Sequence, residues 1–235
     1  LVNMIFNYGI SGLDKLDDNL SDSLASLVSH TSSIGYLDGN GELDLDDTKQ
    51  GASNFNSMLS DMYSLKKLDL LTDDIPAEMQ CIIVNGPRTA YSDTALYKLD
   101  QFIMRGGNVI FFLDPYNEQQ SQQSYYQQSA PQYIPIRTGI EKLLSKYGVE
   151  CGTNYVMDEN CLVQMMQQYG KVNFYYAPLL SPNQLDKKSV ITSNLNKVLF
   201  AQTGSIDVTN ARAIAGEKVT VLAKSSPKAW TVSDD

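Results

Sequence analysis

The chain has 235 residues, 43% of them hydrophobic and 19% charged, which is typical of a globular protein and not of a disordered, collagen-like or coiled-coil chain. No apolar run approaches the roughly 20 residues that cross a bilayer, so a membrane anchor is expected only in segments outside this sequence. The net charge of −9 argues against nucleic acid as a partner, because neutralising phosphates requires an excess of Lys and Arg.

The charge is unevenly distributed along the chain. Residues 1–80 carry 14 acidic and 4 basic side chains, whereas the remainder carries 13 acidic and 14 basic ones. The acidic half is either a solvated exterior or a face that meets a partner.

The cysteines and the single histidine bear on metal and redox chemistry. Cys81, Cys151 and Cys161 form no CxxC pair, and His30 is the only histidine. A zinc site is therefore not expected, and we predict neither a metal nor a cofactor. At most one disulfide can form, which leaves the redox compartment open.

The first predicted element is a helix over Ser11–His30, in which leucines recur every three or four residues. Two interpretations stay open: the helix packs on the core, or it is a stalk that leads from a membrane anchor. We therefore divide the chain into a leading helix or stalk, residues 1–32, and an α/β domain, residues 33–235.

Short apolar runs then alternate with helical patterns. The run Cys81–Asn85 is continuously apolar, as buried parallel strands tend to be. Strands that alternate with long helices predict βαβ units, and hence a three-layer α/β/α, flavodoxin-like fold with a mostly parallel sheet. The predicted strands are Ser33–Leu37, Leu65–Leu71, Cys81–Asn85 and Asn108–Leu113, and the predicted helices are Ala52–Tyr63, one capped by Ser92 and ended by Gly106 and Gly107, and one from Thr138 to Gly148.

Two segments break this alternation. Asn117–Tyr133 is rich in Gln, Ser and Tyr and has no period, so we expect a mobile inserted loop, with a ligand lid as the alternative. Residues 148–235 either extend the sheet or form a subdomain. Their strand candidates are Tyr155–Met157, Val172–Tyr176, Val190–Ile191, Lys197–Phe200 and Val219–Ala223.

Three segments that follow predicted strands are the candidate binding residues, because open α/β folds bind ligands beyond the carboxyl ends of their strands. In the first, oxygen ligands alternate as in a calcium loop, but Leu43 and Lys49 replace the glycine and glutamate of an EF-hand. In the second, Arg88 could bind a carboxylate or phosphate. The three segments are Asp38-Gly39-Asn40-Gly41-Glu42, Gly86-Pro87-Arg88 and Asp114-Pro115-Tyr116.

Nucleophilic catalysis finds little support in the sequence. His30 lies on the leading helix, away from the predicted strand ends, and Cys81 begins a strand and does not sit on a strand-to-helix elbow. The chain has no GxSxG, no P-loop and no GxGxxG after a strand. We therefore predict that the protein is not an enzyme.

The order of several motifs resembles the extracytoplasmic part of gliding-motility-type, GldG-like ABC-transporter auxiliary proteins. That family typically has a Gly-His-Gly-Glu-like turn, in which Asn40 here replaces the histidine. The matching segments, which together span most of the chain, are Gly39–Glu42, Leu65–Leu71, Ile75–Pro87, Leu99–Pro115, Lys146–Asp158 and Leu222–Trp230.

The resemblance implies an α/β domain related to those of intraflagellar-transport proteins and, distantly, to class I glutamine amidotransferases. It also implies an extracytoplasmic location, a membrane anchor outside this sequence, and association with an ABC permease and ATPase. The first hypothesis is thus a non-enzymatic auxiliary domain that binds a partner or ligand through the three strand-end segments. The alternative is a small-molecule or sugar-binding module, or an enzyme, of amidotransferase-like fold.

Overall fold

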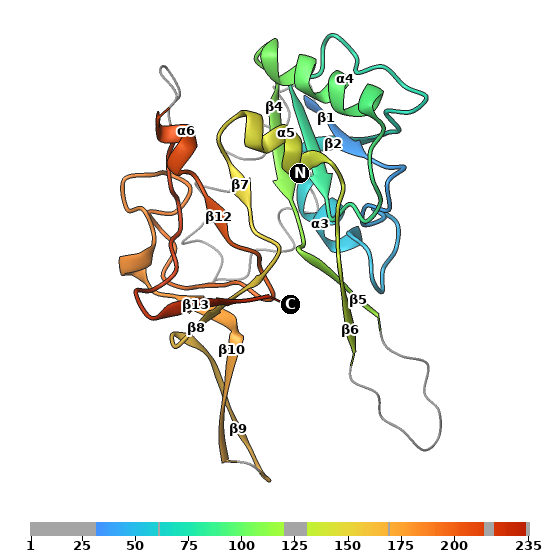
Figure 1. Ribbon diagram of the computed structural model, residues 1–235. Coiled ribbons are helices and arrows are strands. Elements are labelled where there is room, and N and C mark those ends of the chain that lie inside the picture. The colour runs from blue at the N-terminus through green and yellow to red at the C-terminus, as the bar shows by residue number, and fades with distance from the viewer. Residues whose placement is uncertain (1–31, 61, 120–130, 169, 214–218, 234–235) are drawn as a thin grey trace, which may run out of the picture.

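The computed structural model describes residues 32–235 apart from 61, 120–130, 169, 214–218 and 234–235. The predicted helix Ser11–His30 lies outside this part of the chain. None of the described helices has the length and apolar character needed to cross a membrane. Figure 1 shows a parallel-sheet region (described residues of 32–115 and 136–148), a hairpin that extends from it (116–119 and 131–135) and a β-rich region (described residues of 149–233).

Four parallel strands form the central sheet, in the order β2-β1-β3-β4. The third predicted strand has the expected bounds, whereas the predicted Leu65–Leu71 begins and ends earlier. Leu68 pairs with Leu37, the last residue of β1, and the chain then turns at Asp69, whose carboxylate accepts the Leu71 N–H at 2.9 Å. The strands are β1 (Ser32–Leu37), β2 (Tyr63–Leu68), β3 (Cys81–Asn85) and β4 (Asn108–Phe112).

Two helices cover one face of this sheet, α4 (Asp93–Met104) and α5 (Ile140–Lys146). The predicted cap is present, since the Ser92 hydroxyl accepts the Ala95 N–H at 3.1 Å. The second helix is shorter than the predicted Thr138 to Gly148, since it begins at Ile140 and ends at Lys146; the Thr138 hydroxyl lies just before it and accepts the Ile140 N–H at 3.2 Å. The core beneath these helices includes Leu37, Ile82, Val84, Leu99, Phe102, Ile140 and Leu143.

A shorter helix, α3 (Ser53–Leu59), and the loop before it cover the other face. This helix is shorter than the predicted Ala52–Tyr63, because Tyr63 pairs with Ser32 and the chain must be extended there. The second core comprises Tyr36, Leu45, Ala52 and Ile83. The sheet thus carries helices on both faces, and the flavodoxin-like and amidotransferase-like assignments stay predictions.

The described ends of the Gln, Ser and Tyr-rich segment form an antiparallel hairpin, so the prediction of a loop over Asn117–Tyr133 is wrong there. Its strands are β5 (Tyr116–Gln119) and β6 (Gln132–Pro135). The segment lacks hydrophobic alternation, but a two-stranded ladder needs only backbone groups.

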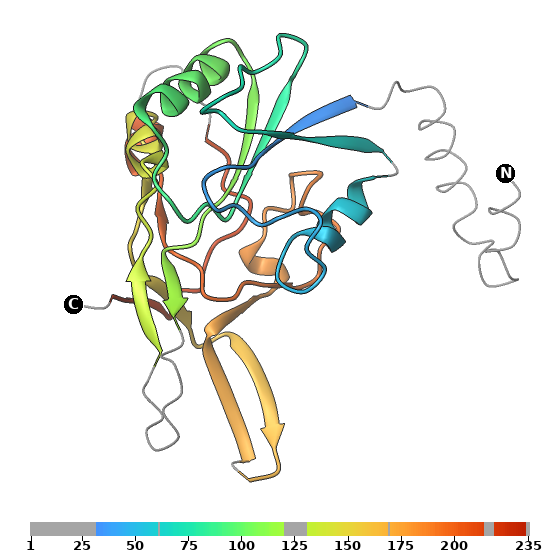
Figure 2. The same ribbon diagram turned by 90° about the vertical axis from the view of Figure 1, so that its right-hand side faces the viewer.

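The β-rich region consists of antiparallel pairs, and its described strands pair with one another and not with the central sheet. Strands β9 and β10 form a long arm that projects from the body (Figure 2). The elements are β7 (Glu150–Cys151), β8 (Tyr155–Asp158), β9 (Cys161–Met166), β10 (Gly170–Leu180), η2 (Pro182–Gln184), β11 (Val198–Leu199), β12 (Ile206–Asp207), α6 (Thr209–Ala213) and β13 (Ala229–Val232).

Two predicted strands in this region are wrong. Val190 and Ile191 lie in a turn with 92% and 70% of their surface exposed, so their apolar side chains pack against nothing that would hold a strand. In Val219–Ala223, the described pairing is a single bridge between Ala223 and Leu185.

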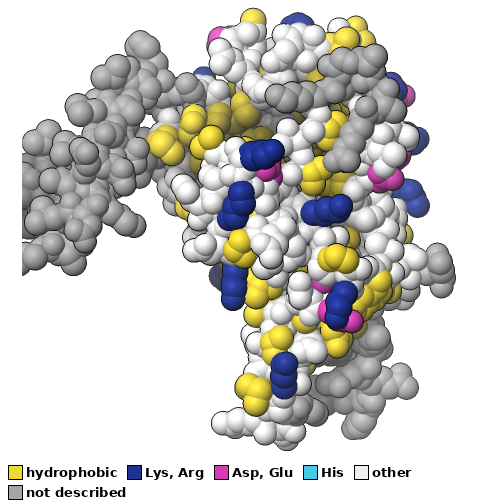
Figure 3. All heavy atoms as spheres, turned by 90° about the vertical axis from the view of Figure 1, so that its left-hand side faces the viewer, with side chains coloured by type: hydrophobic (Ala, Val, Ile, Leu, Met, Phe, Trp, Pro, Cys, Tyr) yellow, Lys and Arg dark blue, Asp and Glu magenta, His cyan; other side chains and the backbone are white. Residues whose placement is uncertain are grey.

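Two features hold the β-rich region together. The carboxylate of the fully buried Asp158 accepts hydrogen bonds from Asn160 N (2.9 Å), Ser226 N (2.8 Å) and Ser226 Oγ (2.6 Å). The Trp230 ring on β13 packs on Tyr175 of β10, with 5.5 Å between ring centroids. Figure 3 shows the side of the molecule that carries this region, where Lys and Arg side chains are spread over the surface and form no dense patch.

Candidate functional site

The three strand-end segments come together at the carboxyl edge of the parallel sheet, as the sequence predicted from strand direction. Backbone hydrogen bonds tie neighbouring segments: Leu43 N donates to Asn85 O at 3.0 Å, and Gly86 N donates to Phe112 O at 2.9 Å. We call the residues 38–42, 86–91 and 114, which lie at this edge, the carboxyl-edge cluster.

Asn40 is the centre of this cluster. Its carbonyl oxygen accepts the backbone N–H groups of Arg88 and Thr89, both at 2.9 Å, and its side-chain amide donates to Ala90 O at 2.9 Å. The residue is 8% exposed. Its polar groups are therefore used to fasten the first turn to the chain that leaves β3.

Glu42 closes the same turn. Its carboxylate accepts the Asn40 backbone N–H at 2.7 Å and the Tyr91 hydroxyl. Burial, together with the hydrogen bond to Glu42, raises the pKa of Tyr91 well above the ordinary value of 10.0. Sequence reasoning missed Tyr91, which lies in an irregular stretch with no motif of its own.

Two glycines of the first turn are required by its geometry. Gly39 and Gly41 have φ angles of +135° and +78°, in the region that side chains disfavour. A Cβ on Gly41 would lie 3.2 Å from Arg88 Cβ, and one on Gly39 would lie 2.9 Å from Asp69 Cγ. The turn therefore packs closely against its neighbours and leaves no room there for a ligand.

The acidic run beyond this turn surrounds a lysine. Lys67 Nζ lies 2.8 Å from Asp44 Oδ1, 2.9 Å from Asp46 Oδ2 and 3.9 Å from Asp38 Oδ2. The hydrogen bonds to Asp44 and Asp46 raise the pKa of Lys67 above its ordinary value. Among the described residues, no group of His, Cys, Asp and Glu side chains is suited to hold a metal ion.

Arg88 and Asp114 form the exposed rim of the cluster. The Arg88 guanidinium donates to the Asn117 side-chain oxygen on β5. Asp114 is exposed and close to Gly86, where a Cβ would lie 3.9 Å from Asp114 Oδ2. Pro115 is buried, and its carbonyl accepts the Ile136 N–H at 3.0 Å.

Tyr116, the last predicted site residue, belongs to a second place in the molecule. Its hydroxyl donates to Thr153 O at 2.9 Å, in the chain that leads into the β-rich region. Its ring centroid lies 5.0 Å from that of Tyr155 and 6.4 Å from that of Tyr133. The three segments thus approach one another, but the side chain of Tyr116 contacts the hairpin and the β-rich region.

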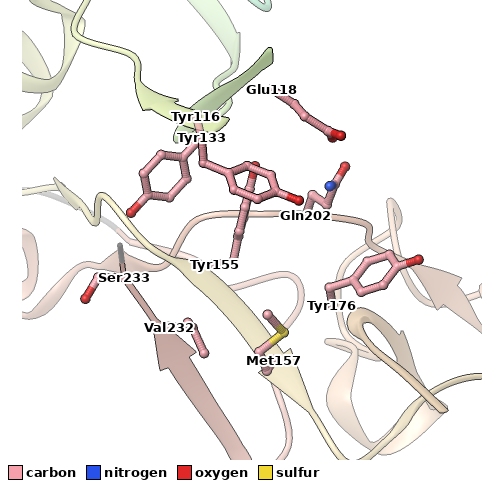
Figure 4. Close-up of a pocket in the computed structure, with 9 residues that line it drawn as sticks. All are labelled: Tyr116, Glu118, Tyr133, Tyr155, Met157, Tyr176, Gln202, Val232 and Ser233. Carbon is pink, nitrogen blue, oxygen red and sulfur yellow. The ribbon is translucent and has the colours of Figure 1, made fainter. Parts of the chain in front are cut away.

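These aromatic rings line a cavity of about 570 Å³ between the hairpin and the β-rich region. In Figure 4, the hairpin supplies Tyr116, Tyr133 and Glu118, and residues of the β-rich region face them across the cavity. We call it the tyrosine cavity. Its lining comprises Tyr116, Glu118, Tyr133, Tyr155, Met157, Tyr176, Gln202, Val232 and Ser233.

The electrostatics of the tyrosine cavity are negative. Burial raises the pKa of Tyr155 to about 12, and the nearby Tyr133, Asp114 and Glu118 add to the rise. The sequence showed that the segment Asn117–Tyr133 is rich in tyrosine, but the residues that meet here come from segments far apart in the chain. Only the approach of the hairpin to the β-rich region brings them together.

The cysteines show no sign of activation. All three are free thiols, and burial raises the pKa of Cys81, of Cys151 and of Cys161. A nucleophilic cysteine needs the opposite shift, because the thiolate is the reactive form. His30, the only histidine of the chain, lies outside the described residues.

Comparisons with known proteins identify a similar fold and a family. A search of curated proteins gives no match. The chain is similar to a solved structure named "mmIFT52 N-terminal domain", with a TM-score of 0.52 and 18% identity, over 76% of this chain and 69% of that one. At this identity the likeness concerns the fold alone, and it agrees with the intraflagellar-transport relation that the sequence resemblance implied. Residues 31–235 match the family described as "ABC-type uncharacterized transport system", so the chain belongs to this family of ABC transport auxiliary proteins.

Proposed function

We propose that the chain is a non-enzymatic, extracytoplasmic domain of a membrane-anchored, GldG-like auxiliary component, which binds the permease of an ABC transport system and associates with the ATPase through that permease. Family membership supports the transport role. The internal use of the polar groups of Asn40 and Glu42 supports the absence of catalysis, because these groups hold the fold together and are not presented to a substrate. The raised thiol pKa values of the cysteines point the same way.

The observation that carries the proposal is the rigid turn at the carboxyl edge. Arg88 is exposed at this edge, and the acidic side chains of Asp38, Asp44 and Asp46, which surround Lys67, are exposed as well. Charges fixed on a rigid surface favour recognition of a protein partner, since little side-chain freedom is lost on binding. Arg88 is the natural test, because it is exposed and makes its side-chain contact with Asn117 at the rim.

The experiment is co-purification of the full-length tagged protein from its native host in mild detergent, with partners identified by mass spectrometry. We expect an ABC permease and ATPase in stoichiometric amounts, and less of both with Arg88→Ala. Arg105→Ala is the matched control: Arg105 is also exposed, but follows α4 and so lies at the opposite edge of the sheet. Recovery of the protein alone from a well-solubilised membrane would overturn the proposal.

One observation favours a second function, the binding of a small molecule. The tyrosine cavity has a volume within the range of ordinary ligand sites, roughly 300–1,000 Å³, and its lining combines aromatic rings with the polar side chains of Glu118, Gln202 and Ser233. Saturable binding of a small molecule that is lost when a cavity residue is replaced would establish this function independently of the transporter.

A further inference from the structure

The walls of the tyrosine cavity present aromatic faces at steep angles to one another. The ring planes of Tyr133 and Tyr155 make an angle of 87° with centroids 5.8 Å apart, and those of Tyr116 and Tyr133 make an angle of 75°. The fourth tyrosine of the lining, Tyr176 on β10, packs its ring on Phe174 with 5.8 Å between centroids. Rings inclined in this way offer π-faces in several directions to one small group, and a cation is attracted to such faces within about 6 Å of the ring centroid.

The charge of the cavity has one sign. Among its nine lining residues Glu118 alone is charged, and Figure 4 shows its carboxylate on the same side of the cavity as the Gln202 amide. Asp114 lies near enough to act with Glu118 on the Tyr155 hydroxyl. An anion would meet carboxylates and π-faces without a basic partner, whereas a cation is attracted by both.

The backbone at one wall is strained. Gln202 has a φ of +53°, the one positive value among the described residues other than glycine. Its N–H donates to the carbonyl of Tyr176 at 2.9 Å, which keeps it in place beside that ring. Residues other than glycine that are held in this conformation cluster at binding sites.

We infer that the tyrosine cavity binds a quaternary ammonium group, with Tyr133 and Tyr155 against its methyl groups and Glu118 as counter-charge. This inference rests on the small-molecule function above and names its ligand class. A metal ion is a poorer fit, because hard cations require several oxygen ligands. A primary ammonium is also a poorer fit, because it needs three hydrogen-bond acceptors where Met157 and Val232 offer apolar surface.

The first experiment compares two probes that differ only in charge. Choline chloride and its neutral isostere, 3,3-dimethylbutan-1-ol, are titrated into the 235-residue protein, and amide shifts are followed by NMR, with sodium chloride to match ionic strength. We expect saturable shifts with choline and roughly three- to thirtyfold weaker binding of the isostere, the range that cation–π attraction supplies. Equal binding of the two would overturn the inference while leaving a ligand-binding cavity, and no saturable shift with choline would overturn it outright.

Variants then identify the groups responsible. Tyr133→Phe keeps a π-face and should bind choline nearly as wild type does, whereas Tyr133→Leu should bind it roughly three- to thirtyfold more weakly. Glu118→Gln should weaken binding by about two- to fivefold, and this loss should shrink at high salt. Tyr97→Leu, on the exposed face of α4, is the control for loss of a tyrosine elsewhere. Equal choline binding by the Phe and Leu variants would refute the role of the ring.

The same group occurs in a free solute and in a lipid headgroup, and a second arm separates these sources. The protein is sedimented with phosphatidylcholine vesicles and, as control, with phosphatidylglycerol vesicles. Selective sedimentation with phosphatidylcholine that free choline reverses would assign the group to a lipid, and choline binding without sedimentation would assign it to a solute. Binding of a neutral sugar panel in place of choline would overturn the inference and keep the small-molecule function.

Discussion

The carboxyl-edge cluster and the tyrosine cavity use polar and aromatic side chains in opposite ways. At the carboxyl edge, the side chains of Asn40 and Glu42 form hydrogen bonds with neighbouring backbone groups and with the Tyr91 hydroxyl. In the tyrosine cavity, the rings of Tyr133 and Tyr155 pack on one another yet remain partly open to a space of about 570 Å³. The position of a residue at the end of a strand thus predicts which other residues it lies near. It does not predict whether its polar groups are free to bind a ligand.

The largest effect is expected from breaking the support of the cavity. Asp158→Ala removes three hydrogen bonds that a buried carboxylate accepts at the end of β8, the strand that carries Tyr155 and Met157. We expect a loss of about 3 kcal/mol in the free energy of unfolding, because Ser226 and its neighbours are left unsatisfied. Chemical denaturation measures this loss.

The neighbouring Glu159 provides the control for Asp158. It is exposed, and its ion pair with Lys228 is of the kind that contributes about 0–1 kcal/mol. A Glu159→Ala variant as unstable as Asp158→Ala would show that the buried hydrogen bonds of Asp158 are not the cause.

A smaller effect is expected at the carboxyl edge. Tyr91→Phe removes the hydroxyl that donates to Glu42 and leaves the ring in the core. We expect a loss of about 1–2 kcal/mol in the free energy of unfolding, the usual result when a partly buried group loses one partner. Thermal unfolding tests this, with Tyr97→Phe on the exposed face of α4 as the matched control. If the two variants unfold alike, the turn does not depend on Tyr91.

The smallest effect at neutral pH is expected for the same substitution in the cavity. Tyr155→Phe keeps the ring contacts, so the free energy of unfolding at pH 7 should change little. Because the pKa of Tyr155 is raised from 10.0 to about 12, its contribution is complete below pH 10 and is lost as pH rises to about 12.

Wild type should therefore lose stability more steeply than Tyr155→Phe between pH 10 and pH 12. Urea denaturation at three pH values in this window measures the difference. If the free energy of unfolding of the two proteins changes with pH in the same way, the pKa of Tyr155 is the same in the folded and unfolded states.

The parallel-sheet region was the more predictable half of the fold. Its strands are short apolar runs whose burial on both faces leaves a direct trace in the sequence, as in Cys81–Asn85. The Ser92 cap, likewise, is a local interaction with residues three positions away. From these elements the meeting of Asp38–Glu42 with Gly86–Arg88 followed, because parallel strands end at one edge.

The β-rich region and its cavity were not predictable in the same way. Strands such as β9 and β13 are mostly exposed and lack a buried face, so they leave no alternation to detect. The apolar pair Val190 and Ile191 was wrongly predicted to be a strand, because both side chains are exposed although they are apolar. The tyrosine cavity depends on contacts between segments that are distant in sequence, and no local pattern encodes those contacts.

The packing of Trp230 on Tyr175 has a practical consequence. The chain has a single tryptophan, and it sits on β13 beside the arm, two residues from the cavity-lining Val232. Tryptophan fluorescence therefore reports on the β-rich region alone, because the parallel-sheet region contains no tryptophan. Comparing tryptophan emission with far-ultraviolet circular dichroism during unfolding would show directly whether the two regions melt as one cooperative unit or in sequence.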